Sequence, residues 1–191
     1  GNYDENTYLL DPEGLLFDFR NNVKYNWEGS RPGYDGDEES VCRYNYVGNY
    51  GKPGPDSDKT GYAYSAGSKH FRAYYNDNYF FGKIPEDQWT LVNFGSWTTT
   101  EKSAYKKAEP FPTGPIITET PELAYVNVLA QAGVSYARDA VDARVINEVK
   151  NGTGSIIDDE DEVGSWPVYN TFGIKVDTDK DGMADEWETE N

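Results

Sequence analysis

Length, composition and charge set the first limits on this protein. The chain has 191 residues and a formal net charge of −17, with 16 Tyr and 19 Gly. So acidic a chain lacks the basic face that nucleic-acid binding needs, which argues against a nucleic-acid partner. No apolar run reaches the ~18 residues of a membrane span, so we expect a soluble protein. Few aliphatic residues with many Tyr and Gly favour short strands and turns, as in an all-β domain, over packed helices.

The start of the chain and its rare residues carry little functional signal. The first residues resemble neither a signal peptide nor a natural start, so we expect a processed chain or a piece of a longer one. Cys42 is the single cysteine and cannot form an internal disulfide. We predict that it is a small buried apolar residue rather than a reactive thiol. His70, the single histidine, lies in a strand-like run and is predicted to be structural.

Three stretches of the chain share one form: a short strand, a turn with asparagine, then an aromatic residue. They span residues 15–27, 42–50 and 70–82. Arg20, Arg43 and Arg72 mark the repeat, at spacings of 23 and 29 residues. A period of about 20–50 residues indicates a stacked architecture, and recurrent asparagines fit a parallel β-helix whose turn side chains bond one another down the stack. The alternative is an antiparallel meander with ordinary asparagine turns.

The segments between and after these repeats are predicted to be loops. Residues 28–40 are rich in Gly, Asp and Glu, and residues 52–56 form a rigid turn with two prolines. Residues 86–115 show no repeat, as expected of a segment that leaves the solenoid and crosses its surface. Asn151 begins an Asn-Gly-Thr glycosylation sequon, which would matter only in a eukaryotic secretory pathway.

Two helices are predicted to follow and to pack on the solenoid. The first has Thr120 as its N-cap and Pro121 at its first position, and it ends at Gly133. The second runs from about residue 138 to residue 150. The apolar residues expected to pack are Leu123, Val126, Leu129 and Ala130 in the first helix and Val141, Val145, Ile146 and Val149 in the second.

Residues 177–188 have the spacing of an EF-hand-type calcium loop. Carboxylates stand at loop positions 1, 3, 5, 9 and 12, and glycine at position 6 permits the sharp turn. Calcium takes about six to eight oxygen ligands, so alternate residues of a tight loop must point inward. The alternative is an acidic, solvated tail. The predicted ligands are Asp177, Asp179, Asp181, the Met183 carbonyl, Asp185 and Glu188.

Several of these stretches resemble one known family. The runs 18–27 and 46–55 are similar to the later rungs of pectate lyases of polysaccharide lyase family 1. The runs 138–145, 151–154 and 157–188 resemble the tail of its bacterial members. The resemblance implies a right-handed parallel β-helix in three parts: later rungs and their loops in residues 1–109, a helical extension in 110–172 and the calcium loop in 173–191.

The implied activity is calcium-dependent β-elimination that cleaves α-1,4-galacturonan, in a secreted, periplasmic or cell-surface setting. Family members are longer than this chain, and their catalytic arginine lies in an Arg-Asn-Pro-Arg-like segment that would fall before its first residue. Arg31-Pro32 has the wrong neighbours for that segment. We therefore expect the C-terminal half of a lyase and assign no catalytic residue to this chain.

An acidic polysaccharide such as galacturonan needs cations to hold it, and the predicted substrate-binding residues are Arg20, Lys24 and Lys52. The other half is expected to be either on a separate chain or absent, and the open solenoid end offers self-assembly as an alternative. A non-catalytic carbohydrate-binding or structural assembly module is the alternative function. A calcium-sensor module is a weaker alternative, because a sensor needs helices on both sides of its loop.

Overall fold

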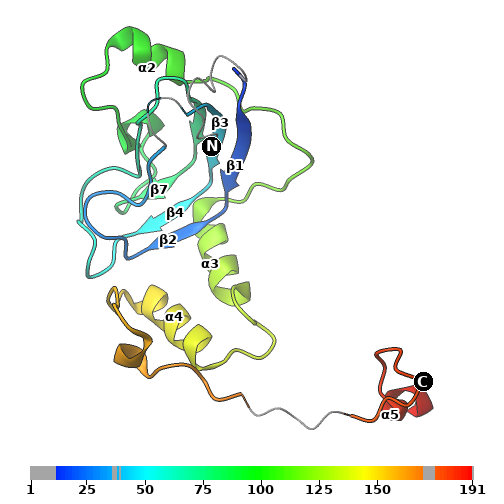
Figure 1. Ribbon diagram of the computed structural model, residues 1–191. Helices are drawn as coiled ribbons and strands as arrows, with labels where there is room; N and C mark the ends of the chain where they lie inside the picture. Colours follow the sequence, from blue (N-terminus) through cyan, green and yellow to red (C-terminus); the bar gives the residue numbers. More distant parts are fainter. Residues whose placement is uncertain (1–11, 36–37, 39, 170–174, 191) are drawn as a thin grey trace.

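The structure is a computed structural model that describes residues 12–35, 38, 40–169 and 175–190. Its centre is a stack of short strands in three sheets, and all named strand pairs are parallel (Figure 1). The first sheet holds β1 (Leu15–Arg20), β3 (Cys42–Val47) and β6 (Arg72–Asn76). The second holds β2 (Val23–Tyr25), β4 (Tyr50–Lys52) and β7 (Tyr79–Phe80), and the third holds β5 (Tyr64–Ser65) and β8 (Val92–Asn93).

Each sheet is built from strands one repeat apart along the chain, so the antiparallel meander is wrong. β1, β2 and Tyr34 belong to one turn of the chain. Tyr34 forms an isolated parallel bridge to Ser65 of the next turn, which stacks on the first. This connectivity is compatible with the parallel β-helix that we expected. The right-handed coil stays a prediction.

A ladder of asparagines joins the turns between the first two sheets. The Asn49 side-chain oxygen accepts hydrogen bonds from the backbone and side-chain amides of Asn22, at 3.1 and 3.2 Å. The Asn78 oxygen accepts the same pair from Asn49, at 3.1 and 2.9 Å. Gln88 ends the ladder with its side-chain oxygen, which accepts both amides of Asn78. The predicted bonding of turn asparagines down the stack is therefore confirmed.

The ladder also corrects the repeat that the arginines suggested. Asn22, Asn49 and Asn78 are 27 and 29 residues apart, and these intervals match the strand register. Arg43 pairs in register with Arg72, whereas Arg20 lies opposite Val47. Arg20 is thus not part of the arginine repeat, and the asparagines define the period.

Aromatic side chains fill the inside of the stack. The Tyr46 ring lies between Phe19 and Tyr75, with ring centroids 5.4 and 4.8 Å away. Tyr44 stacks on Phe17 at 5.2 Å. Because parallel rungs place the same position of each turn above the last, rings from successive turns meet face to face, and each buried ring removes a large apolar area from water. Cys42 is buried at the edge of this core, as predicted.

The first part of the segment 86–115, predicted to leave the solenoid and cross its surface, closes one end of it instead. The 3-10 helix η1 (Gln88–Leu91) leads directly into β8, and α2 (Thr99–Tyr105) follows. Thr98 and Glu101 form a capping box at the start of α2, a Thr-x-x-Glu signal that the sequence carried and that we missed. Tyr105 is fully buried, and the Lys107 amide bonds the Ala73 carbonyl of β6. We call this the α2 end.

The helix α3 (Pro121–Gln131) begins at the Thr120 cap as predicted but turns a different face to the sheets. Its buried residues are Pro121 and Ala124, and the Tyr125 ring lies 4.5 Å from that of Tyr50. Leu123 and Val126, expected to pack, are exposed. The face of α3 that packs against β4 is thus the one with the small Ala124.

The helix α4 (Ala140–Asn151) is capped by Asp139 and ends at Gly152 in a left-handed conformation. None of its residues is buried, so the predicted apolar stripe does not enter the core. The 3-10 helix η2 (Glu160–Val163) and α5 (Asp185–Glu190) complete the helices of the described chain. Within the described residues, no helix has both the length and the apolar character to cross a membrane.

Candidate functional site

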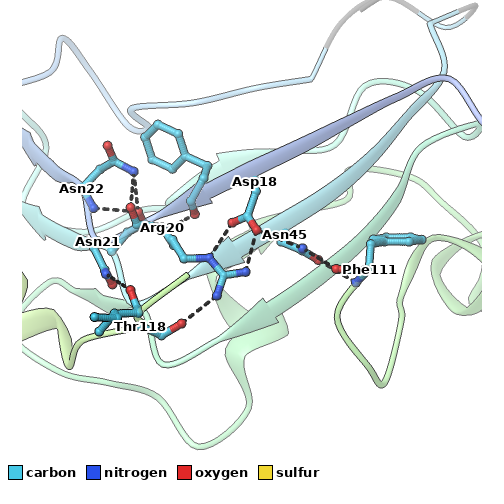
Figure 2. A network of polar contacts seen from close by, with 10 residues as sticks. Asp18, Arg20, Asn21, Asn22, Asn45, Phe111 and Thr118 are labelled. Carbon is cyan, nitrogen blue, oxygen red and sulfur yellow. Dashed lines mark hydrogen bonds and ion pairs between the residues drawn. The ribbon is translucent and has the colours of Figure 1, made fainter. Parts of the chain in front are cut away.

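Arg20, a predicted substrate-binding residue, lies in a polar network at the end of β1 (Figure 2). Its guanidinium donates two hydrogen bonds of 2.6 Å to the Asp18 carboxylate and one of 2.6 Å to the Thr118 hydroxyl. Burial alone would raise the pKa of Asp18, but the bonds from Arg20 and Asn45 hold that pKa below its ordinary value. A sugar carboxylate would therefore have to compete with Asp18 for this cation.

The same network ties the segment after the solenoid to its first strands. Asn45 bonds the backbone of Phe111 in both directions, at 2.9 and 3.0 Å. Asn21 accepts from the Glu119 amide and donates to the Ile117 carbonyl, as Figure 2 shows in part. Two asparagine amides thus satisfy the backbone of a stretch that has no strand partner, which fixes residues 111–119 across β1 and β3.

Lys24, the second predicted substrate-binding residue, points into the solenoid. Its ammonium lies 4.7 Å from the Phe19 ring centroid and 5.2 Å from that of Tyr46. It also donates to the Pro32 carbonyl at 3.4 Å. Burial lowers the pKa of Lys24 to about 8, because water is replaced by aromatic faces that solvate the charge only in part.

Lys52, the third predicted substrate-binding residue, caps the C-terminal end of α4. Its ammonium donates to the carbonyls of Val149 and Lys150, at 2.6 and 3.0 Å. The last carbonyls of a helix lack partners within the helix, and a cation satisfies both their hydrogen bonds and the negative end of the dipole. The three predicted cations thus have separate protein partners and do not meet in one cleft.

A cavity of about 330 Å³ opens at the other end of the stack, beside β1. Apolar rings line it together with Lys24 and the carboxylate of Asp35. Leu15 and Phe17 are 50% and 43% exposed there, and no described strand pairs with β1 on the side away from β3. We call this the β1 end.

Asp35 is a buried carboxylate that sequence reasoning missed, because a lone acid in a Gly- and Asp-rich loop carries no distinguishing pattern. One of its oxygens accepts from the amides of Gly67 and Ser68, and the other accepts from the Tyr105 hydroxyl at 3.2 Å. Burial raises the pKa of Asp35 to about 6, although these hydrogen bonds act in the opposite direction. The residue links a loop beside the β1 end to α2.

The predicted calcium loop brings three of its carboxylates together. Oxygens of Asp177, Asp179 and Asp181 lie within 4.8 Å of one another. The two Asp177 oxygens accept from the amides of Lys180 and Gly182, at 2.7 and 3.0 Å, and Gly182 has a φ of 98° that favours glycine. The loop backbone therefore holds the first carboxylate in place and turns sharply at loop position 6, as predicted.

Asp185 and Glu188, two further predicted ligands, lie outside this cluster of carboxylates. Asp185 accepts from the amide and hydroxyl of Thr178, at 2.7 and 2.6 Å, and caps the turn before α5. Glu188 lies in the first turn of α5. Three converging hard oxygen donors fit a calcium ion, while the ligand roles of the Met183 carbonyl, Asp185 and Glu188 stay predictions.

Comparison with known proteins connects this fold to one class of enzyme. No model of a known protein family matches the chain. The chain is similar to the probable pectate lyase C of Aspergillus flavus, with 30% identity over 184 residues. It is 31% identical to that of Neosartorya fischeri over 179 residues and 32% identical to that of Aspergillus terreus over 185 residues.

These alignments cover nine tenths of the chain but only part of each relative. The shares of this chain are 91%, 90% and 91%, and the share of each relative is 41%. The chain thus spans about two fifths of the length of the curated relatives that it matches. The similarity supports a pectate-lyase-like protein and agrees with the parallel sheets. The relatives named here are fungal, and the bacterial type of tail stays a prediction.

Proposed function

We propose that the chain forms the later rungs of a pectate-lyase-like polysaccharide lyase, which cleaves α-1,4-galacturonan by calcium-assisted β-elimination when the upstream rungs are present. The observation that carries this proposal is the similarity to pectate lyases over nine tenths of the chain. The stacked parallel rungs support it. Galacturonan is an extracellular polymer, so the proposal includes a secreted, periplasmic or cell-surface location.

The β1 end is where the upstream rungs would stack. Its exposed Phe17 and Leu15 continue the aromatic and apolar interior of the solenoid. Among the described residues, no group donates to the side-chain oxygen of Asn22, which stands where Asn49 and Asn78 each accept from the neighbouring rung. A further rung would supply those donors and cover the cavity.

Calcium is proposed at the loop 177–188, where it would neutralise carboxylates that otherwise repel one another. The role proposed for this ion is structural. Calorimetric titration with Ca²⁺ tests it: Asp179→Asn should weaken binding by about tenfold, since one charged ligand is worth about 1.5–3 kcal/mol. Asp161→Asn removes the same charge outside the loop and should leave binding unchanged. Equal weakening by both variants would reduce the loop to a non-specific acidic tail.

A substrate-binding role for Arg20, Lys24 and Lys52 stays part of the proposal, although each cation has a protein partner. Arg20 is the strongest of the three, because its guanidinium could exchange the Thr118 hydroxyl for a sugar carboxylate. Arg20→Lys would keep the charge and lose the two-point contact with Asp18. It should therefore weaken galacturonan binding less than Arg20→Met does.

The lyase itself is tested by an assay on polygalacturonate, read as the ultraviolet absorbance of the unsaturated product. The chain alone should give no product, and the same chain behind upstream rungs should give product that EDTA abolishes. Product from the chain alone would place the catalytic base within these residues. No product from the longer polypeptide, with its fold verified by circular dichroism, would overturn the lyase proposal.

The apolar β1 end also supports the second candidate function, a non-catalytic assembly module. In that case the uncovered rung would stack on a second copy. Sedimentation of the chain over a range of concentrations separates the two: a dimer or filament disrupted by Phe17→Lys supports assembly, and a monomer that gains activity behind upstream rungs supports the lyase.

A further inference from the structure

A second pocket lies on the outer side of β8, away from the three cations discussed above. Its volume is about 350 Å³, within the range of small-ligand pockets, about 300–1,000 Å³. Residues of three neighbouring elements line it: η1, β8 with the turn that follows, and α2 with its C-cap. The α2 end therefore carries a hollow that does not depend on upstream rungs.

Two lysines one helical turn apart face this pocket. Lys102 and Lys106 both line it, and their ammonium groups lie 5.9 and 5.4 Å from the centroid of the Phe94 ring. Lys106 also lies 5.2 Å from the Trp89 ring. Among the residues that the structure describes, neither lysine forms an ion pair, whereas Lys69 nearby pairs with Glu101 at 2.8 Å.

Unpaired lysines are notable in a chain with a formal net charge of −17. Two cations held side by side repel each other, and the aromatic faces beneath them compensate this repulsion only in part. The only carboxylate among the lining residues is Asp87, which caps η1 by accepting from the Trp89 amide at 3.0 Å. The arrangement leaves net positive charge over an aromatic floor.

The other lining groups suit a sugar ring. Tyr62 is 39% exposed and Trp89 is half-buried, so each offers an aromatic edge or face to the pocket. Thr90 and Asn93 add a hydroxyl and an amide. A uronate has an apolar ring face, hydroxyls and one carboxylate, and these match aromatic, polar and cationic groups respectively.

We infer that this pocket is a binding site for an acidic saccharide, with Lys102 and Lys106 holding a uronate carboxylate and the exposed Tyr62 contacting the apolar face of the sugar ring. Arg20, Lys24 and Lys52 do not line this pocket, and the inference concerns binding alone. The inference rests on the proposed function only in the choice of galacturonate as the first ligand to test.

Titration calorimetry of the intact chain with tetragalacturonate tests the site. Lys102→Met and Lys106→Met keep the aliphatic stem over the rings and remove the charge. Each should weaken binding by about tenfold, since a hydrogen bond to a charged group is worth about 1.5–3 kcal/mol. Lys107→Met is the matched control: it removes a neighbouring charge that does not line the pocket, and it should leave affinity unchanged.

Two further measurements keep the inference falsifiable. The double variant with arginine at both positions retains both positive charges and should still bind. Binding by this variant would show that the weaker binding of the methionine variants comes from the lost charge and not from unfolding. The neutral tetrasaccharide of galactose should bind at least tenfold more weakly than tetragalacturonate. Three results would each overturn the inference: unchanged affinity in the variants Lys102→Met and Lys106→Met, equal weakening by Lys107→Met, or equal binding of the neutral sugar. The lyase assay reads a different event, so either proposal can fail alone.

Discussion

The two ends of the solenoid differ in what covers the hydrogen-bonding groups and the apolar side chains of the terminal rung. At the α2 end, Gln88 accepts both amides of Asn78, Tyr105 fills the core, and Lys107 continues the pairing of β6. At the β1 end, the described structure shows exposed Leu15 and Phe17 beside a cavity. At the α2 end, residues outside the repeat make the contacts that a further rung would make. At the β1 end, the apolar side chains of the last described rung remain exposed.

This difference shows how a repeat stack ends. Each rung supplies acceptors and an apolar face to its neighbour, so a terminal rung needs a cap or another rung. The glutamine that caps the ladder is one methylene longer than asparagine and comes from η1 rather than from a turn. The longer side chain lets Gln88 of η1 supply the hydrogen-bond acceptor that the asparagine of a further rung would supply.

The largest loss of stability is expected for a substitution in the middle of the asparagine ladder, at Asn49. Asn49 is fully buried, and Asn49→Ala removes the acceptor of both Asn22 amides and the side-chain donor to the Phe19 carbonyl and the Asn78 oxygen. The free energy of unfolding should fall by about 3–5 kcal/mol, at about 1–3 kcal/mol for each unsatisfied buried group. Urea denaturation measures it. Asn151→Ala, at an exposed position, is the control and should change stability by no more than about 0.5 kcal/mol.

Asp35 should make stability depend on pH, because burial raises the pKa of its carboxylate above the ordinary value. Its folded pKa of about 6 lies above the ordinary value of 3.8, so the folded state binds the proton more tightly. The free energy of unfolding should therefore fall by about 3 kcal/mol as the pH rises from 3.8 to about 6, and stay level above that.

Asp35→Asn should abolish that fall, since the amide oxygen still accepts from Gly67 and Ser68 and carries no charge. Relative to Asp35→Asn, Asp35→Ala should cost about 2–3 kcal/mol at every pH, because the two amides lose their acceptor. Urea denaturation midpoints of the wild type and both variants, measured below and above this pH window, test these expectations. Equal pH slopes in the wild type and the asparagine variant would refute the assignment.

The two ladder ends should differ when their terminal side chains are removed. Gln88→Ala takes the acceptor from both buried amides of Asn78 and should cost about 2–3 kcal/mol. Asn22→Ala leaves the backbone amide of residue 22 bonded to Asn49 and should cost about 1 kcal/mol or less. Thermal unfolding compares them. A larger loss at residue 22 would mean that the β1 end is already covered.

Lys24 should also make stability depend on pH, with a sign opposite to that of Asp35, and its substitution should have the smallest effect on stability. Its folded pKa of about 8 is below the ordinary 10.5, so the unfolded state binds the proton more tightly and stability should rise between those two pH values. Lys24→Met should remove this dependence and stabilise the chain at neutral pH by about 1–2 kcal/mol, after the lost cation–π contacts are counted. Destabilisation by methionine would show that the charge has a partner that supports the fold.

The stack could be predicted from the sequence because its turns carry their own signal. Asn22, Asn49 and Asn78 recur at the true period, and Thr120 and Asp139 cap their helices locally. Partners of the cations could not be predicted. Arg20 meets Thr118 across 98 residues, and Lys52 meets Val149 across 97, so only the folded chain brings them together.

The face of α3 that packs was also beyond sequence reasoning. An apolar stripe through Leu123 and Val126 looks like a buried face, yet the sheet selects the face with Ala124. Local periodicity indicates which residues of a helix could be buried, and the packing of the helix against β4 decides which of them are. The spacing of the calcium loop, in contrast, needs no distant partner, so the convergence of Asp177, Asp179 and Asp181 could be anticipated.

Amide hydrogen exchange tests the central claim, that the β1 end receives further rungs, most directly. It compares this chain alone with the same chain behind upstream rungs. We predict that amides of β1 and β2 exchange quickly in the chain alone and gain protection in the longer polypeptide, while the Asn78 amide is protected in both. Equal exchange of β1 and β2 in the two samples would contradict the account, because it would mean that no rung stacks there.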